Sequence, residues 1–144
     1  MNNKMVLKFN SLSENEAFAR NVISAFILPL NPSVSELSDI KTAVSEAVTN
    51  AIVHGYPDSV GEVTMVAEIS GNNVHIIISD SGVGIENLEE ALEPFFTTKP
   101  EEERSGMGFT IIKTFMDDVK VMSKLNVGTV VDMMKKILPA ADNM

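Results

Sequence analysis

The chain has 144 residues, enough for one compact domain and too few for a second of ordinary size. Twenty acidic residues against 11 basic ones argue against a nucleic-acid-binding surface, and the apolar content of 44% is ordinary for a globular protein. The absence of cysteine excludes disulfides, zinc–thiolate sites and cysteine nucleophiles, and no apolar run reaches the ~18 residues of a membrane span. We expect a cytoplasmic protein with a single domain over residues 1–144, of which 139–144 form a disordered tail.

The first two predicted elements are a strand and a helix. Residues 4–10 alternate loosely between apolar and polar side chains, which is typical of a strand. Ser13 and Glu16 form an S-x-x-E pattern, which predicts a capping box at the start of a helix that ends near Pro29. The apolar residues expected along this helix are Ala17, Val22, Ile23 and Phe26.

Ser33 and Glu36 repeat the S-x-x-E pattern and predict a second, longer helix. Gly55 is expected to end this helix at the position that helices favour for a terminal glycine. Glu46 and Asn50 are four residues apart and so share one face, beside the apolar stripe. Taken alone, such a pair is more often two solvated helix residues than a site. The stripe consists of residues at three- and four-residue steps: Leu37, Ile40, Val44, Ala47, Val48 and Ala51.

Two strands, over 62–69 and 74–80, are predicted to form a hairpin around the Gly-Asn-Asn sequence at 71–73. Asp80 ends an apolar run, and its carboxylate can accept a hydrogen bond from an exocyclic amine such as that of adenine. Gly82 and Gly84 allow a sharp turn and a close approach to a flat ring. An aspartate bonded to its own glycine turn is an equally good interpretation of this stretch alone.

A short helix over 86–93 and a polar loop over 94–105 are expected next, followed by a helix from 106–108 to about Asp117. Glycines at a helix start expose N–H groups that can bind phosphates. This motif alone is weak, and the three glutamates at 101–103 fit a phosphate site only if they point outward. The candidate phosphate-binding residues of this segment are Thr97, Thr98, Lys99, Arg104, Ser105, Gly106, Met107 and Gly108.

A final strand pair is predicted over 119–123 and 129–137. The hydroxyl of Thr129 can support the adenine end of a pocket, although a β-branched residue opening a strand is the commoner explanation. The element order strand, helix, helix, strand, strand, loop, helix, strand, strand predicts an α/β (α+β) fold. It is a two-layer sandwich with a mixed, mostly antiparallel sheet and helices on one face.

The order and spacing of these motifs resemble the GHKL ATPases and kinases, which have the Bergerat ATP-binding fold. The stretch SEAVTNAIVHGY (45–56) resembles the N box, DSGVGI (80–85) the G1 box and RSGMGF (104–109) the G2 box of that family. With SENEAFAR (13–20) and PFFTTKPEEERSGMGF (94–109), the similarity extends over almost the whole chain to the anti-sigma-F factors of sporulating bacteria, which are serine kinases.

The resemblance implies ATP or ADP and Mg²⁺ as cofactors, with Glu46 as general base and Asn50 as metal ligand. It implies that Asp80 reads the adenine amine, and that Gly82 and Gly84 shape the floor of the base pocket. The loop from Thr97 to Ser105 would close over the nucleotide. The residues implied to bind nucleotide are Asn50, Asp80, Gly82, Gly84, Thr97, Thr98, Lys99, Arg104, Ser105, Gly106, Met107, Gly108 and Thr129.

The resemblance also implies a homodimer that holds a sigma factor of the sigma-F type and phosphorylates an anti-anti-sigma partner on serine. Direct nucleic-acid or membrane binding is not expected. Arg20 matches a partner-docking position, and a plain solvated arginine is an equally good interpretation. Two alternatives stay open: an ATP-gated sigma-binding module that transfers no phosphate, and a paralogous anti-sigma kinase of a stress response.

Overall fold

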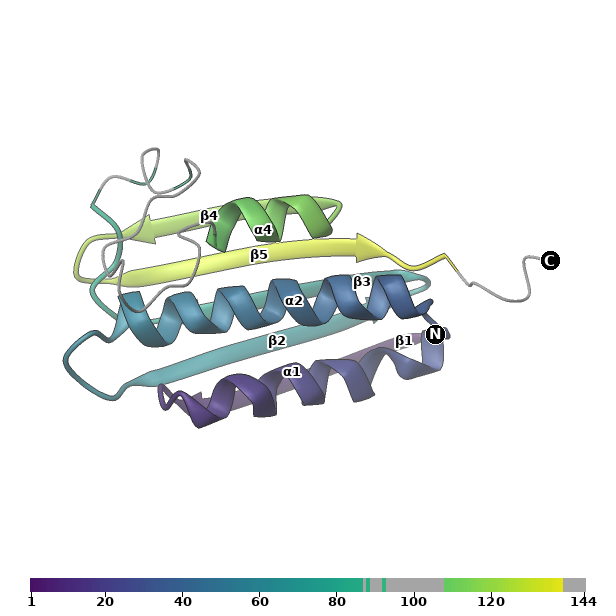
Figure 1. Cartoon of the computed structure of the whole chain (residues 1–144), viewed down its shortest axis with the longest axis horizontal. Coiled ribbons are helices and arrows are strands. Elements are labelled where there is room, and N and C mark those ends of the chain that lie inside the picture. The colour runs from purple at the N-terminus through teal and green to yellow at the C-terminus, as the bar shows by residue number, and fades with distance from the viewer. Residues whose placement is uncertain (87, 89–91, 93–107, 139–144) are drawn as a thin grey trace.

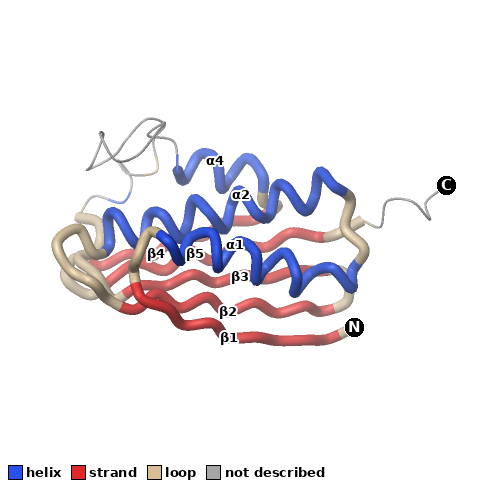
Figure 2. Tube along the Cα trace, turned by 60° about the horizontal axis from the view of Figure 1, so that its bottom comes forward, coloured by secondary structure: helices blue, strands red, loops and turns tan. Residues whose placement is uncertain are grey.

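Strands with alternating apolar residues build a sheet whose one face is covered by helices (Figures 1 and 2). The computed structural model describes residues 1–86, 88, 92 and 108–138. Its five strands run in the order β1-β2-β3-β5-β4, and each neighbouring pair is antiparallel, which confirms the predicted fold class. The strands are β1 (Asn2–Asn10), β2 (Glu62–Ser70), β3 (Asn73–Asp80), β4 (Asp118–Lys124) and β5 (Gly128–Lys136).

The helix layer consists of α1, α2 and α4, with α2 packed between the other two. The second capping box is confirmed: Ser33 Oγ accepts from the Glu36 N–H at 3.0 Å, and Glu36 Oε1 accepts from the Ser33 N–H at 2.9 Å. Most of the predicted stripe is buried: Ile40, Val44, Ala47 and Val48 of α2 and Ala51 of the following turn belong to the core, and Leu37 is partly buried against it. The bounds are α1 (Glu14–Ile27), a 3₁₀ turn η1 (Leu28–Leu30), α2 (Val34–Asn50), a π-helical turn η2 (Ala51–Gly55) and α4 (Gly108–Phe115).

The capping box predicted at Ser13 is wrong, because Ser13 already has a helical backbone (φ −57°, ψ −31°). An N-cap side chain reaches the first free N–H groups from an extended backbone, which Ser13 lacks. Its hydroxyl donates instead to Glu14 at 3.0 Å, and Glu16 forms an ion pair with Arg20 at 3.2 Å. The buried face of α1 is also shifted: of the four predicted apolar residues only Ile23 is fully buried, together with Ala19 and Ile27.

Gly55 does not end α2 in the predicted way. Among the described residues the glycines with positive φ are Gly71, Gly84 and Gly128, whereas Gly55 closes a π-helical turn that continues the helix. The predicted helix over 86–93, the polar loop over 94–105 and the tail over 139–144 lie largely or wholly outside the described residues. Within the described part of the chain, no helix combines the length and apolar character that crossing a membrane requires.

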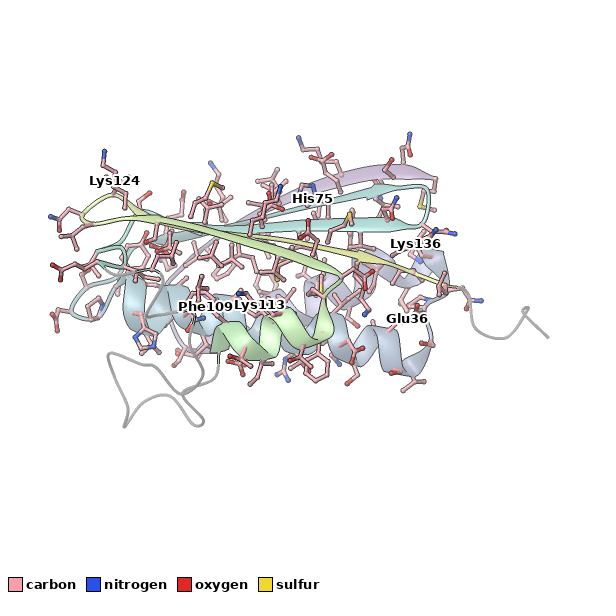
Figure 3. All side chains as sticks on the ribbon, turned by 90° about the horizontal axis from the view of Figure 1, so that it is seen from above. Glu36, His75, Phe109, Lys113, Lys124 and Lys136 are labelled. Carbon is pink, nitrogen blue, oxygen red and sulfur yellow. The ribbon has the colours of Figure 1, made fainter. Side chains whose placement is uncertain are left out.

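Glu36 ties the start of α2 to the segment that follows β5, at the end of the molecule opposite Lys124 (Figure 3). Its Oε2 accepts from the Leu138 N–H at 2.7 Å, while Oε1 serves the capping box. Burial raises the pKa of Glu36, but the N–H groups of Leu138 and Ser33 and the nearby Lys135 outweigh it and hold the pKa below its ordinary value. The ionised carboxylate therefore stabilises the fold.

We expect Glu36→Gln to lower the free energy of unfolding at neutral pH by about 1 kcal/mol, since the amide presents one acceptor where the carboxylate presents two. Because the folded-state pKa is lowered, the contribution is present above the ordinary glutamate pKa and is lost as pH falls through the folded value. The difference between wild type and variant, measured by urea unfolding, should therefore shrink on acidification. A difference that stays constant from neutral to acidic pH would contradict the assignment.

Candidate nucleotide-binding site

The predicted site residues gather at one end of the sheet. The C-terminal end of α2, the end of β3 and the start of α4 lie at this end (Figure 1). Glu46 and Asn50 belong to the last turns of α2, and Gly108 is the buried first described residue of α4. Seven further predicted residues lie outside the described part of the chain: Thr97, Thr98, Lys99, Arg104, Ser105, Gly106 and Met107.

Close backbone contact joins the helix layer to the glycine turn that follows β3. Gly55 O accepts from the Val83 N–H at 2.8 Å. A Cβ on Gly82 would lie 2.0 Å from Gly55 O, and a Cβ on Gly55 would lie 2.9 Å from the Asp80 carboxyl group. Real Cβ atoms do not approach backbone so closely, so Gly82 must be glycine, whereas a side chain at Gly55 would displace the Asp80 carboxylate. The role of Gly55 is therefore to admit the Asp80 carboxylate, not to cap the helix.

Asp80 places a carboxylate in this partly buried corner. Its Oδ1 accepts from the Gly82 N–H at 2.9 Å, which is the local turn bond considered from the sequence. Burial raises the pKa of Asp80, and the N–H groups of Gly82 and Thr129 offset only part of that rise. Within the described residues, Asp80 takes part in no ion pair. The carboxylate keeps acceptor capacity for an N–H donor of a ligand.

Asp80, Thr129 and Ser123 form a polar row across three strands. Thr129 on β5 is the register partner of both Asp80 on β3 and Ser123 on β4. The hydroxyl oxygens of Ser123 and Thr129 lie 2.7 Å apart, and Ser123 Oγ also accepts from the Ile85 N–H at 2.8 Å. The row thus links the aspartate to the far end of the glycine turn.

Gly84 and Gly128 complete the close packing around this row. Gly84 has φ +74°, and a Cβ there would lie 2.1 Å from Lys124 O. Gly128 has φ +138°, and a Cβ there would lie 2.0 Å from Asp80 O. Both residues combine a positive φ with close backbone contact, which only glycine accommodates easily.

Tyr56 holds the start of the glycine turn, at Ser81, whereas Ser123 holds its end, at Ile85. The Tyr56 hydroxyl accepts from the Ser81 N–H at 2.7 Å and donates to Glu62 O at 2.7 Å. Its ring lies so close to Gly61 that a Cβ there would fall 2.2 Å from a ring carbon. Tyr56 follows η2 directly, so it fixes the turn relative to both the helix and β2.

Asn50 and Glu46 offer different chemistry from adjacent turns of α2. The side-chain nitrogen of Asn50 is buried and has no hydrogen-bond partner among the described residues. A buried unpaired amide costs about 1–3 kcal/mol, so this side chain is suited to a polar ligand. Glu46 is half-buried and lines a cleft of about 350 Å³ between α1 and α2. The cleft is lined by Arg20, Val34, Leu37, Ser38, Lys41, Thr42, Ser45 and Glu46.

The structure thus brings Asp80, Gly82, Gly84 and Thr129 into one corner beside the end of α2. Arg20 lies apart from this corner, in the cleft that it shares with Glu46. Sequence reasoning missed Tyr56 and Ser123. Ser123 had a detectable signal, since it continues the inward alternation of Val119 and Val121 with a polar residue. Tyr56 ends the stretch that resembles the N box, but nothing in that stretch indicates its contacts with Glu62 at the start of β2 and with Ser81 after β3.

Comparisons with known proteins show the family to which the chain belongs. A family model described as a histidine kinase-like ATPase domain matches residues 9–135. The chain is 56% identical to the anti-sigma F factor of Anoxybacillus flavithermus over 95% of this chain and 94% of that protein. It is 56% identical to the anti-sigma F factor of Clostridium perfringens, over 95% and 99% of the two chains. A Thermoanaerobacter anti-sigma F factor is 54% identical over 94% of each chain.

Solved structures support the fold. The RsbU and RsbW domains of a Mycobacterium tuberculosis protein match with a TM-score of 0.67 at 17% identity. That match covers 94% of this chain, which spans 32% of the other protein's length. The catalytic domain of the histidine kinase ThkA matches with a TM-score of 0.57 at 18% identity, over 94% of this chain and 97% of that domain.

We expect Tyr56→Phe to lower the free energy of unfolding by about 1 kcal/mol, because the Ser81 N–H loses its acceptor while the ring packing is kept. Urea unfolding followed by circular dichroism measures the change. Tyr56→Ala is the comparison, since it also removes the ring beside Gly61 and should cost more. If Tyr56→Phe and wild type unfold at the same urea concentration, the hydroxyl does not hold the turn.

Proposed function

Because this chain belongs to the anti-sigma F factor family and has a histidine kinase-like ATPase domain, we propose that it is an ATP-dependent serine protein kinase. We propose that it also binds and inhibits a sigma factor of the sigma-F type. Its substrate is an anti-anti-sigma partner that it phosphorylates on serine, and it acts as a homodimer. The bound nucleotide decides which partner it holds: ADP favours the anti-anti-sigma protein and ATP favours the sigma factor.

The single observation that carries this proposal is that Asn50 and Glu46, one turn apart on α2, lie beside different sites. Asn50 has a buried amide nitrogen with no partner among the described residues, and it ends the helix that leads through η2 into the corner that contains Asp80. Glu46, one turn earlier, lines the cleft that also contains Arg20 and Lys41. A kinase needs a nucleotide site and an acceptor site that meet at one carboxylate, and this helix separates the two by a single turn.

In the nucleotide site, Asp80 accepts from the adenine amine, and Gly82 and Gly84 let the base approach the backbone. The unpaired amide nitrogen of Asn50 is a donor and suits a phosphate oxygen, while the amide oxygen of the same side chain is the atom that would hold Mg²⁺. When bound, Mg²⁺ supplies positive charge that neutralises the phosphates. The N–H groups at the start of α4, beginning with Gly108, bind phosphate. We assign the same task to Thr97, Thr98, Lys99, Arg104, Ser105, Gly106 and Met107.

At the acceptor side, Glu46 takes the proton of the substrate serine hydroxyl. The serine oxygen bonds to the γ-phosphorus, and the bond between the γ-phosphorus and the bridging oxygen of the β-phosphate breaks, which releases ADP. Phosphoryl transfer demands mainly orientation and charge stabilisation, so one carboxylate is enough to orient the nucleophile. The cleft beside Glu46 presents Arg20 and Lys41, and it suits a protein surface with acidic side chains. Arg20 would contact the partner protein there.

We expect Glu46→Ala to reduce phosphoserine on the anti-anti-sigma partner by roughly 10²–10⁴-fold, because the general base is removed. Phosphate transfer is measured with Mg·ATP and purified partner, and nucleotide affinity is measured separately by calorimetry and should stay unchanged. Glu46→Gln is the matched control, since it keeps the side-chain size and removes only the basic oxygen. If wild type and Glu46→Ala transfer equally little phosphate while nucleotide binding is intact, the protein is an ATP-gated binding module and not a kinase.

We expect Asp80→Asn to weaken adenine-nucleotide binding by about 10–100-fold, since a hydrogen bond to a charged acceptor is lost. The fold should survive. Because the pKa of Asp80 is raised, its ionised form lowers stability as pH rises through the folded value, and the neutral amide avoids this loss. Wild-type affinity should also fall on acidification through that pKa. Calorimetric titration and thermal unfolding measure the two effects, and an unchanged ATP affinity would contradict the adenine role.

A further inference from the structure

Ser123 is the residue of the polar row that sequence reasoning did not assign to the site. It lies on β4, opposite Thr129, on the sheet face where Val131 is buried under the helices. Its side chain makes three contacts: the Ile85 N–H at 2.8 Å, the Gly128 carbonyl oxygen at 3.2 Å and the Thr129 hydroxyl at 2.7 Å. A serine hydroxyl has one proton and two lone pairs, so three contacts use its full capacity.

The direction of two of these hydrogen bonds is fixed by chemistry. The Ile85 N–H can only donate, so it occupies one lone pair of Ser123 Oγ. The Gly128 carbonyl oxygen can only accept, so it takes the Ser123 proton. All three bonds are then made together only if the Thr129 hydroxyl donates to the second lone pair of Ser123.

This assignment determines what Thr129 can offer to a ligand. With its proton directed at Ser123, its oxygen has only lone pairs left for other partners. Asp80, the register partner of Thr129 on β3, is an acceptor as well when ionised. Two adjacent acceptors complement an amino group with two N–H bonds. They repel a carbonyl oxygen, because both are acceptors and neither can donate to it. Guanine has a carbonyl oxygen at the position where adenine has its amine.

We propose that Ser123 sets the base preference of the nucleotide site, by holding the Thr129 hydroxyl as a hydrogen-bond acceptor toward the base. The inference rests on the proposed adenine-nucleotide function. Ser123 is thus a positioning residue that acts through Thr129. Its bond to the Ile85 N–H also anchors the glycine turn, and that contact affects all nucleotides alike.

Base preference is measured as the ratio of GDP to ADP dissociation constants, by calorimetry on the full chain. In Ser123→Ala the Thr129 hydroxyl is free to donate to a carbonyl, and we expect the ratio to fall by about tenfold. Ser123→Thr keeps the hydroxyl and should restore the ratio. Ser79→Ala, on the other face of the sheet, is the matched control and should leave it unchanged. If alanine prevents folding, Ser123→Cys keeps the side-chain size with a weak hydrogen-bonding group and should show the same fall.

Thr129→Val tests whether Ser123 acts through Thr129. In a Thr129→Val background, Ser123→Ala should produce no further change in the ratio, because the group that it orients is gone. If Ser123→Ala weakens ADP and GDP equally, Ser123 only supports the turn and the inference is overturned. If wild type prefers ADP but the variants keep its ratio, the inference fails while the proposed function stands. If wild type binds neither nucleotide, both fail.

Discussion

The contact between Gly55 and Gly82 is the constraint on which the rest of the site depends. A carbonyl oxygen at the end of η2 accepts from the Val83 N–H, and two residues without side chains allow the approach. This contact fixes the end of α2 relative to β3. Glu46 and Asn50 depend on it for their position, because they lie on the helix that leads into η2.

The same contact brings Asp80 into a partly buried environment. The carboxylate is partly compensated by the N–H groups of Gly82 and Thr129, and its pKa stays raised. Ionisable groups whose pKa is displaced by burial are enriched at functional sites. Around Asp80 the supporting bonds come from two hydroxyl groups, of which Tyr56 ends the stretch that resembles the N box and Ser123 lies outside every motif. Tyr56 holds the turn at Ser81, and Ser123 holds it at Ile85. The glycine turn that follows Asp80 is therefore held in place by the hydroxyl groups of Tyr56 and Ser123.

The sequence predicted the strands, the two long helices and the two-layer arrangement, because hydrophobic periodicity reports which side of each element is buried. It failed where backbone geometry decided the outcome. Ser13 and Ser33 open the same S-x-x-E pattern, yet only Ser33 has the extended backbone that a cap requires (ψ 163°). Ser13 lies in a tight turn in which the Leu12 N–H donates to Asn10 O at 2.8 Å and the Asn15 side chain donates to the same oxygen at 2.9 Å. The function of Gly55 could not be read from its neighbours either, because Asp80 approaches it from a distant strand.

The polar row has a consequence for the folding of the chain during its synthesis. Asp80, Thr129 and Ser123 lie on three strands, and β5 is inserted between β3 and β4 although it is synthesised after both. Pairings between residues distant in sequence form slowly, since the intervening chain must first be ordered. A nascent chain on the ribosome therefore lacks the polar row, and with it the proposed adenine site, until β5 has emerged and paired on both sides. Nucleotide would then select, among newly made chains, those whose sheet is complete.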